Sequence, residues 1–353
     1  MGDTGGVPET DLEHTFDKAR EAFEALAGAD IFITGGTGFF GKWLLETYVH
    51  ACRRLKGRGS LTVLTRDPEA FKTAMPHLAS CECLRFIEGD VRTFEFPDRK
   101  FTHIIHGATE ANANVITEQP AMMKDVIIEG TRRMIEFAFC SGANRFLLTS
   151  SGAVYGRQPP SVSQIPEELF DSYEAMQVSS AYAVGKREAE KLCVDAAALD
   201  DLGATTARCF AFIGPHLPLD LHYAAGNFIR DGLAGKNIHV SGDGSPYRSY
   251  LHTADLAAWL WTILVRGGEG DAYNVGSDEA VTIGDLAARI ASRFGVGVKI
   301  EGTPLAEGQT SWYVPRIKLA RDKLGLDTWL KLDEAIERTT KWHLESKNDR
   351  SGP

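Results

Sequence analysis

The chain has 353 residues, of which 43% are hydrophobic, and its formal net charge is −10. This length and apolar content are enough for a large core in one or two domains. The acidic balance disfavours nucleic-acid binding, because no basic stripe is present to release counterions from phosphates. No apolar run is as long as a membrane span, and the N-terminus lacks the charged start and apolar core of a signal peptide.

The six cysteines are scattered along the chain, a usage typical of a reduced protein, so we expect a cytoplasmic location. Cys81 and Cys83, with His77 nearby, fit no common zinc-binding spacing. We therefore expect no metal site.

The N-terminal region, residues 1–29, is expected to hold a tail and one helix. Apolar residues recur at helical spacing from Asp11 to Leu26. This pattern predicts a single helix that packs on the outside of the following sheet.

A glycine-rich turn follows the first strand. The apolar, β-prone run 31–34 ends at Gly35, and a helical pattern that reaches about residue 55 begins directly after the turn. Glycines at 35, 38 and 41 let the chain turn sharply, let a pyrophosphate approach the backbone, and let the helix pack close to the strand. The N–H groups and the positive dipole end of that helix favour a phosphate. Taken alone, an ordinary glycine-rich turn remains an alternative.

Strands and helices alternate after this turn. Further strands are expected at 61–65, 84–88, 101–106 and 145–149, and helices at 120–140, 227–235, 254–265 and 282–294. Alternation of this kind predicts an α/β fold, a doubly wound parallel sheet with helices on both faces. Ligands of such sheets bind at the carboxyl ends of the strands.

The pattern loosens beyond Cys209, where loops rich in Gly, Pro and His indicate a smaller substrate-binding lobe. We predict a dinucleotide-binding domain over 30–210 and a lobe that occupies mainly 211–345, with some segments returning to the sheet. Residues 346–353 are expected to form a tail.

The second chemical feature is a tyrosine and a lysine four residues apart, Tyr182 and Lys186, which share one face if they lie on a helix. An ammonium group beside a phenol lowers the phenol's pKa and prepares it for acid–base work. Ser151, just after the predicted strand 145–149, can supply a hydroxyl to the same substrate oxygen. By itself the pair could be a surface Tyr and Lys, since the spacing is common; the glycine turn and the serine favour the catalytic interpretation.

With these motifs the chain resembles the extended short-chain dehydrogenase/reductases that modify nucleotide sugars. The resemblance covers about residues 30–342 and rests on segments 34–41, 89–91, 150–156, 208–215, 247–252 and 273–276, together with Tyr182 and Lys186. It implies a Rossmann domain that binds a nicotinamide dinucleotide, with Ser151, Tyr182 and Lys186 as the catalytic trio.

The resemblance also implies ligand contacts. Asp90 and Val91 are expected at the adenine and Arg248 at the diphosphate of a nucleotide sugar, because a guanidinium holds phosphate oxygens through parallel hydrogen bonds. Asn227 is a further expected substrate contact. The full set of expected cofactor contacts is Gly35, Thr37, Gly38, Phe39, Phe40, Gly41, Thr65, Arg66, Asp90, Val91, Gly107, Ala108, Thr109, Ser150, Tyr182, Lys186 and Phe210.

Departures from the family's patterns narrow the reaction. The dTDP-glucose 4,6-dehydratases carry an Asp-Glu pair after the catalytic hydroxyl, and UDP-glucuronate decarboxylases usually have a Glu; here Gly152 and Ala153 occupy these positions. Neither side chain can transfer a proton, which favours 4-epimerases and 4-ketoreductases. Ala211 and Ile127 stand where many relatives have Asn.

The cofactor depends on the end of the second strand. NAD-binding relatives have an acid there, whereas this chain has Thr65 followed by Arg66, which suits a 2′-phosphate. Asp67 keeps NAD open as the alternative. We predict NADP.

The leading hypothesis is therefore an NADP-dependent 4-ketoreductase of a nucleoside-diphosphate-4-keto-6-deoxy sugar, and the alternative is an NAD-dependent nucleotide-sugar 4-epimerase. A dehydratase, a decarboxylase or a non-catalytic dinucleotide sensor fits the sequence less well. The family also implies a homodimer formed by helices around 120–140 and 178–195, with apolar residues along the first: Met122, Met123, Val126, Ile127 and Met134.

Overall fold

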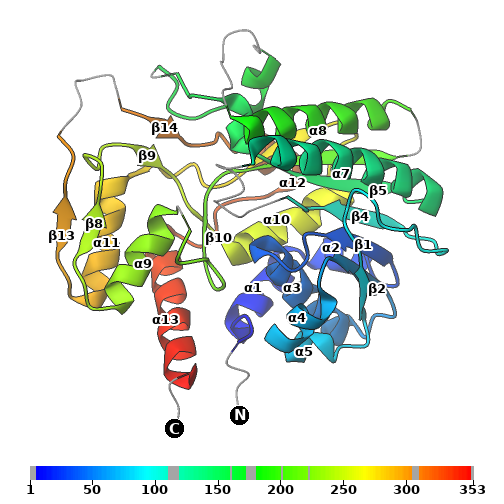
Figure 1. The fold of residues 1–353 in the computed structure, drawn as a ribbon, viewed down its shortest axis with the longest axis horizontal. Helices are drawn as coiled ribbons and strands as arrows, with labels where there is room; N and C mark the ends of the chain where they lie inside the picture. Colours follow the sequence, from blue (N-terminus) through cyan, green and yellow to red (C-terminus); the bar gives the residue numbers. More distant parts are fainter. Residues whose placement is uncertain are drawn as a thin grey trace. The chain divides into compact units, whose positions relative to one another are not determined.

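The computed structural model describes residues 5–109, 119–159, 161–171, 180–199, 202–221, 223–303 and 310–350 (Figure 1). The chain packs as two compact units. Unit 1 comprises residues 1–154, 178–209 and 257–273, and unit 2 comprises residues 155–177, 210–256 and 274–353.

Unit 1 is built around a seven-stranded sheet with the strand order β11-β6-β5-β4-β1-β2-β3. Its strands are β1 (Asp30–Thr34), β2 (Ser60–Thr65), β3 (Leu84–Glu88), β4 (His103–His106), β5 (Arg145–Ser151), β6 (Gly203–Cys209) and β11 (Ala272–Val275). β1 pairs in parallel with β2 and with β4, so the strand order reverses beside β1. This is the doubly wound parallel sheet that the sequence predicts, and ligands of such folds bind at the reversal.

Helices cover both faces of this sheet (Figure 1). α7 (Pro120–Ser141) and α8 (Ala181–Ala197) lie side by side on one face. α3 (Phe39–Leu55) and α10 (Thr253–Arg266) lie on the other, where Trp261 Nε1 of α10 donates to Thr47 Oγ1 of α3 at 3.0 Å. Two short helices, α4 (Pro68–Ala74) and α5 (Pro76–Ala79), connect β2 to β3.

The apolar face of α7 packs against the core of its own protomer, so the prediction that this face forms a dimer interface is wrong for its buried residues. Met123, Ile127 and Met134, expected on a dimer face, are at most 1% exposed and pack with Phe32 and Phe146 inside the protomer. An apolar stripe on a helix indicates which face is buried. It does not indicate whether the covering surface belongs to the same protomer or to a partner. Of the expected stripe, Met122 is exposed.

The N-terminal helix is also different from the prediction. Two helices, α1 (Glu9–Lys18) and α2 (Arg20–Ala25), replace the single one, with a break at Ala19 where φ is −112° and ψ is 21°. Both helices pack against α3, and Phe23 of α2 also contacts Trp261 of α10, with ring centroids 5.6 Å apart. The break keeps Phe16 and Phe23 buried, with their ring centroids 5.9 Å apart.

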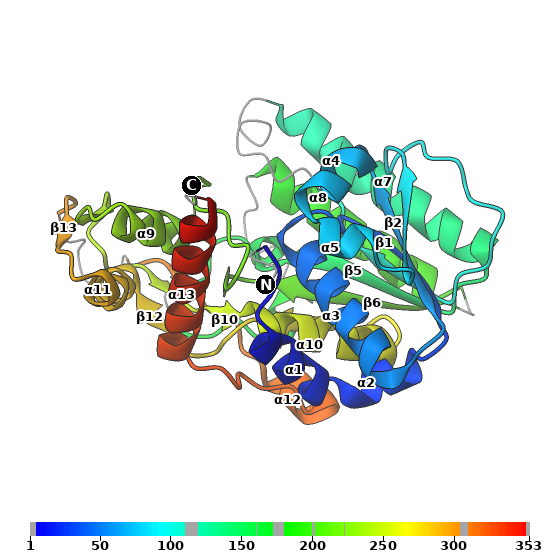
Figure 2. The same cartoon turned by 90° about the horizontal axis from the view of Figure 1, so that it is seen from below.

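Within its described residues, unit 2 contains three small sheets and four helices besides the first turn of α10 (Figure 2). The sheets are β10-β7, β12-β9-β14 and β13-β8, built from β7 (Phe212–Ile213), β8 (Ile238–Val240), β9 (Tyr247–Arg248), β10 (Leu251–His252), β12 (Val281–Thr282), β13 (Val298–Ile300) and β14 (Trp312–Tyr313). The helices are α9 (Ala224–Leu233), α11 (Ile283–Phe294), α12 (Lys318–Leu324) and α13 (Leu332–Arg350). α13 thus continues through the start of the expected tail at 346.

Two 3₁₀ turns, η1 (Gly152–Tyr155) and η2 (Glu167–Asp171), follow β5. Among the residues that the structure describes, no helix is long and apolar enough to cross a membrane.

Candidate active site

The glycine turn between β1 and α3 has the geometry that a dinucleotide requires. Gly35 has φ of +74°, and a Cβ there would lie 2.5 Å from the carbonyl of Gly107. A Cβ at Gly41 would lie 2.3 Å from Gly35 O, so α3 packs directly against the turn. The helix begins after Gly38 with no side-chain cap. Its first N–H groups therefore remain for an anionic ligand.

A buried histidine that the sequence analysis did not single out supports this turn. His106 Nδ1 lies 2.8 Å from Thr34 Oγ1, and His106 Nε2 lies 3.1 Å from Thr131 Oγ1. Thr34 Oγ1 also accepts a hydrogen bond from Ala108 N at 3.1 Å, which holds the strand end beside Gly35. Burial, and then the Lys186 charge, lowers the pKa of His106 to about 3, so this ring is neutral. Its place at the carboxyl end of β4 was the signal available in the sequence.

At the end of β2, Thr65 is half-buried, and Arg66 and Asp67 are exposed. Asp67 caps α4, because its Oδ1 accepts a hydrogen bond from Ala70 N at 2.9 Å. Asp67 is the acid that could hydrogen-bond the adenosine ribose of NAD. One of its carboxylate oxygens is thus already used to cap α4.

The expected adenine contacts, Asp90 and Val91, follow β3. Arg92 donates to Asp90 from its backbone N at 2.9 Å and from its guanidinium at 2.9 and 3.0 Å. These bonds hold the pKa of Asp90 below its usual range. Asp90 is therefore a fixed carboxylate, and Val91 beside it is buried.

The catalytic residues come from β5 and α8. Ser180 caps α8 by accepting from Ala183 N at 3.1 Å, and the helix then presents Tyr182 and Lys186 on one face, with the Lys186 Nζ 5.9 Å from the Tyr182 ring centroid. Lys186 is 2% exposed and donates to Thr149 O at 2.8 Å, near the end of β5. Ser151 ends the same strand.

Burial lowers the pKa of Lys186 to about 8. The ammonium group is thus held away from water, where its field acts strongly on neighbouring groups.

A buried ion pair that was not predicted from the sequence lies one helical turn beyond Lys186. Glu190 Oε2 accepts from Arg208 Nη2 at 2.9 Å and from Nε at 3.1 Å, and both side chains are 5% exposed. Ser150 Oγ donates to Glu190 Oε1. The hydroxyl of Ser150, an expected cofactor contact, is thus directed at α8, next to Ser151.

The expected ligand residues of unit 2 are separate from this group and are described by themselves. Arg248 on β9 is half-buried, and its Nη1 donates to Tyr247 O at 2.7 Å. Within the described part of the chain its Nε and Nη2 make no hydrogen bond. The Phe210 and Tyr313 rings contact each other with centroids 4.7 Å apart and planes inclined by 37°, and Asn227 Oδ1 on α9 accepts from Arg230 at 3.2 Å.

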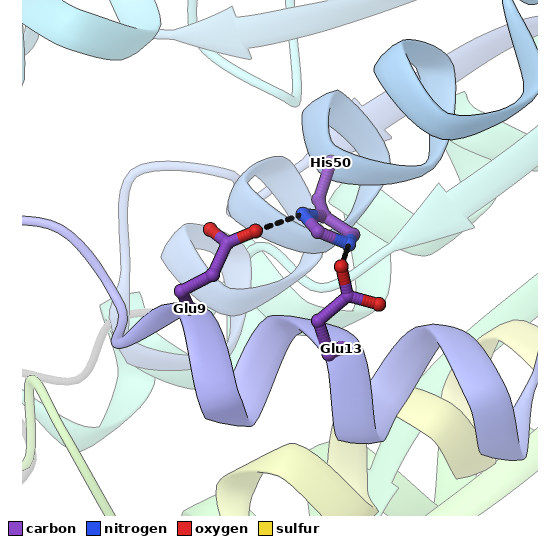
Figure 3. Close-up of side chains that lie close together, drawn as sticks. All are labelled: Glu9, Glu13 and His50. Atoms are coloured by element: carbon purple, nitrogen blue, oxygen red, sulfur yellow. Dashed lines mark ion pairs between the residues drawn. The ribbon is translucent and has the colours of Figure 1, made fainter.

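A further cluster of polar side chains joins α1 to α3 (Figure 3). Glu9 and Glu13 lie 3.7 and 3.5 Å from opposite ring nitrogens of the buried His50. Arg54 already forms an ion pair with Glu13 at 2.7 Å. An arginine beside Glu13 opposes a second cation there, so the cluster is best described as ion pairing that docks α1 on α3.

Comparison with known proteins identifies the family. The model of the NAD dependent epimerase/dehydratase family matches residues 31–276. The chain belongs to this family. Among curated relatives, a dTDP-glucose 4,6-dehydratase of Streptomyces antibioticus is 23% identical over 330 residues, covering 90% of this chain and 93% of its own. UDP-glucuronic acid decarboxylase 2 of Arabidopsis thaliana is 29% identical over 311 residues, covering 88% and 67%.

Solved structures of other proteins share the fold. The epimerase Mth375 of Methanothermobacter thermautotrophicus superposes with a TM-score of 0.78 at 24% identity, covering 95% of this chain and 98% of its own. A UDP-glucose 4-epimerase of Thermotoga maritima, solved with UDP-glucose, gives 0.76 at 20% identity and covers 90% and 99%. At these identities the likeness shows the fold alone.

The residues of unit 1 fit the dinucleotide that the family name implies. The turn at Gly35 has no room for a side chain, and the α3 N-terminus has no side-chain cap. In addition, the buried Thr109 Oγ1 makes no hydrogen bond to any described residue. These three features suit a ligand with phosphate oxygens and sugar hydroxyls.

Proposed function

We propose that this protein is an NADP-dependent 4-ketoreductase of a nucleoside-diphosphate-4-keto-6-deoxy sugar. The observation that carries the proposal is the arrangement of Tyr182 and Lys186 on α8, with Lys186 anchored to Thr149 O near the Ser151 end of β5. The family supports nucleotide-sugar chemistry with a nicotinamide cofactor.

Each member of the trio has a separate task. Tyr182 gives a proton to the C4 oxygen as a ketone is reduced, and Ser151 orients that oxygen. Lys186 keeps the Tyr182 pKa low and holds the nicotinamide ribose. The nicotinamide, when bound, supplies the hydride.

Dehydration and decarboxylation need a further acid or base, and the segment after Ser151 does not offer one. Gly152 and Ala153 begin the 3₁₀ turn η1 and have no titratable group. This difference argues against the functions named for its dehydratase and decarboxylase relatives.

The NADP choice rests on Arg66. A guanidinium at this exposed position suits a 2′-phosphate, and Asp67 is occupied as the cap of α4. Arg66→Ala, tested by NADPH titration, has Asp67→Asn as its matched control. This control removes the charge of the neighbouring side chain but keeps the helix cap, because asparagine caps a helix as well as aspartate does.

The substrate's diphosphate is assigned to Arg248. Its Nη1 is fixed by Tyr247 O, while Nε and Nη2 are the two donors that grip phosphate oxygens in parallel. Solved neighbours carry UDP-glucose or UDP-glucuronic acid together with NAD, which supports a nucleotide sugar here. Asn227 is proposed as a second substrate contact.

An NAD-dependent 4-epimerase is the second candidate. It is favoured by epimerases among the structural neighbours and by other neighbours that were solved with NAD bound. The test is to denature the purified protein and identify what it releases. Stoichiometric NAD(H) would support the epimerase and contradict the reductase; an empty site that binds NADPH would do the reverse.

A homodimer through α7 and α8 is also proposed. The exposed Met122 and Phe139 on α7 and Val194 on α8 supply apolar surface for it. A specific interface buries at least about 1,000 Å² in total. A monomer by light scattering at micromolar concentration would contradict it.

A further inference from the structure

The last residues of β5 are attached to α8 at two consecutive positions. Lys186 Nζ donates to Thr149 O at 2.8 Å, and the Ser150 hydroxyl donates to Glu190 Oε1. Lys186 and Glu190 are four residues apart, so they lie on successive turns of one face of α8. The helix therefore holds the strand directly before Ser151.

The register of the sheet brings a third side chain into this group. Ser150 of β5 is paired with Arg208 of β6, so both side chains stand on the same face of the sheet. Arg208 Nη2 and Nε donate to Glu190 Oε2 at 2.9 and 3.1 Å. The Glu190 carboxylate thus joins the ends of two neighbouring strands to α8.

The alternation of side chains along β5 gives the same direction for Ser150. Phe146 and Leu148 belong to the core cluster that also contains Ala189 and Cys193 of α8. Successive side chains of a strand point to opposite faces, so Ser150 lies on the face of Phe146 and Leu148. Its side chain therefore points toward α8.

The hydrogen bond of Ser150 is protected from water. Ser150, Glu190 and Arg208 are each 4% exposed. A serine hydroxyl has one proton, and Ser150 donates it to Glu190. In this arrangement the hydroxyl has no proton left for a cofactor, and its bond to a charged group is stronger than one between neutral groups.

The end of β5 has few other restraints. β4 pairs with β5 only as far as Leu148, so within the described residues the last three positions of β5 are paired with β6 alone. The Lys186 bond holds one backbone oxygen in this stretch, and the strand end can still pivot about a single point. The Ser150 bond supplies a second point one residue further along.

We propose that Ser150 is a positioning residue, anchored on Glu190, which fixes the end of β5 so that Ser151 keeps a constant place relative to Tyr182. The proposal rests on the proposed function for the roles of Ser151 and Tyr182. It replaces the cofactor contact expected for Ser150 with an action through its neighbour. A catalytic group that moves by about 1 Å can lose about a hundredfold in rate, so this restraint matters for turnover.

The test compares Ser150→Ala with Ser141→Ala in the full-length protein. Ser141 is the matched control, because it is also buried and its hydroxyl donates to Ala138 O within α7. Both variants lose one buried hydroxyl, so urea unfolding should show a similar loss of stability in both. A loss of rate confined to Ser150→Ala then separates positioning from a general structural role.

We expect Ser150→Ala to lower the single-turnover rate of the C4 reaction about ten- to hundredfold. The dissociation constants of NADPH and NADH should stay within about twofold of those of the parent, since the hydroxyl does not meet the cofactor. Ser141→Ala should change neither the rate nor these constants.

Hydrogen exchange followed by mass spectrometry tests the restraint without any reaction. In Ser150→Ala, peptides that contain residues 149–151 should exchange about tenfold faster than in the parent, because a hydrogen bond to a charged group is worth at least about that factor. The same peptides should exchange at the parent's rate in Ser141→Ala. A parent that neither reduces a 4-keto sugar nor interconverts 4-epimers would contradict the proposed function, and the exchange rates would still decide whether Ser150 restrains the strand.

Three results would overturn the proposal. The first is a turnover rate of Ser150→Ala within about twofold of the parent's. The second is cofactor binding weakened about tenfold or more, which would make the Ser150 hydroxyl a cofactor contact. The third is unchanged hydrogen exchange at residues 149–151.

Discussion

Replacement of Lys186 by methionine should abolish turnover and yet make the protein more stable near neutral pH. The ammonium group is 2% exposed, and burial lowers its pKa from 10.5 to about 8. A difference of about 2.5 in pKa, at about 1.4 kcal/mol for each unit, means that the charged lysine costs the native state about 3 kcal/mol. Methionine has a similar volume and no charge, but it loses the hydrogen bond to Thr149 O, worth about 1 kcal/mol. The net gain at about pH 7 is therefore about 2 kcal/mol.

The pH dependence of the stability difference tests whether the buried charge of Lys186 causes it. Below about pH 8 Lys186 is protonated in both the native and the unfolded protein, and the native state carries the full cost. Between about pH 8 and 10.5 the unfolded chain binds the proton more strongly, so the parent becomes more stable as the pH rises. The advantage of Lys186→Met over the parent should therefore shrink through this range and end near zero or below.

Urea unfolding of the parent and of Lys186→Met at about pH 7 and about pH 10 measures the difference in their free energies of unfolding. Lys191→Met is the control, because Lys191 is exposed on the same helix and its replacement should leave stability unchanged within about 0.5 kcal/mol. If Lys186→Met is less stable than the parent at neutral pH, or if the gap does not change with pH, the buried-charge argument is wrong.

Three further substitutions test other parts of the account. Tyr182→Phe should leave cofactor binding intact and lower turnover by about 10²–10⁴, and turnover within a few-fold of the parent would remove the proposed acid–base role. Arg66→Ala should lose a charge-assisted contact and weaken NADPH binding about ten- to hundredfold in titrations while NADH binding hardly changes; an equal loss for both would mean that the side chain does not meet the 2′-phosphate. Glu190→Ala should cost about 3–5 kcal/mol in urea unfolding because it leaves Arg208 charged, buried and without this carboxylate, whereas the exposed Glu188→Ala on the same helix should change stability by less than about 0.5 kcal/mol.

The parts of the fold that depend on local patterns were predictable from the sequence. The strand, glycine turn and helix over 30–55 have a signature within one short segment, and the structure confirms the close packing of the helix that these glycines imply, since a Cβ at Gly41 would lie 2.3 Å from Gly35 O. The four-residue spacing of Tyr182 and Lys186 fixes their common face once the segment is helical. The family match confirms the nucleotide-sugar branch that these motifs suggested.

Features that depend on distant partners were not predictable. Glu190 and Arg208 look like ordinary charged residues in the sequence, and only the packing of α8 against β6 shows that they neutralise each other in the core. His106 is similar. It supports the glycine turn through its contact with Thr34, which lies 72 residues earlier in the chain. The apolar stripe of α7 gave the buried face correctly but not its partner, which for Met123 and Met134 is the protomer's own core.

The central claim is that this chain exchanges a hydride between a nicotinamide cofactor and C4 of a nucleotide sugar. The most direct measurement incubates the protein with NADPH deuterated at the transferable position of the nicotinamide and with a nucleoside-diphosphate-4-keto-6-deoxy sugar, and then locates the label in the product by NMR. We predict one deuterium bound to C4 of the sugar and no label at its other carbons. Conversion of the sugar without deuterium at C4 would contradict the account.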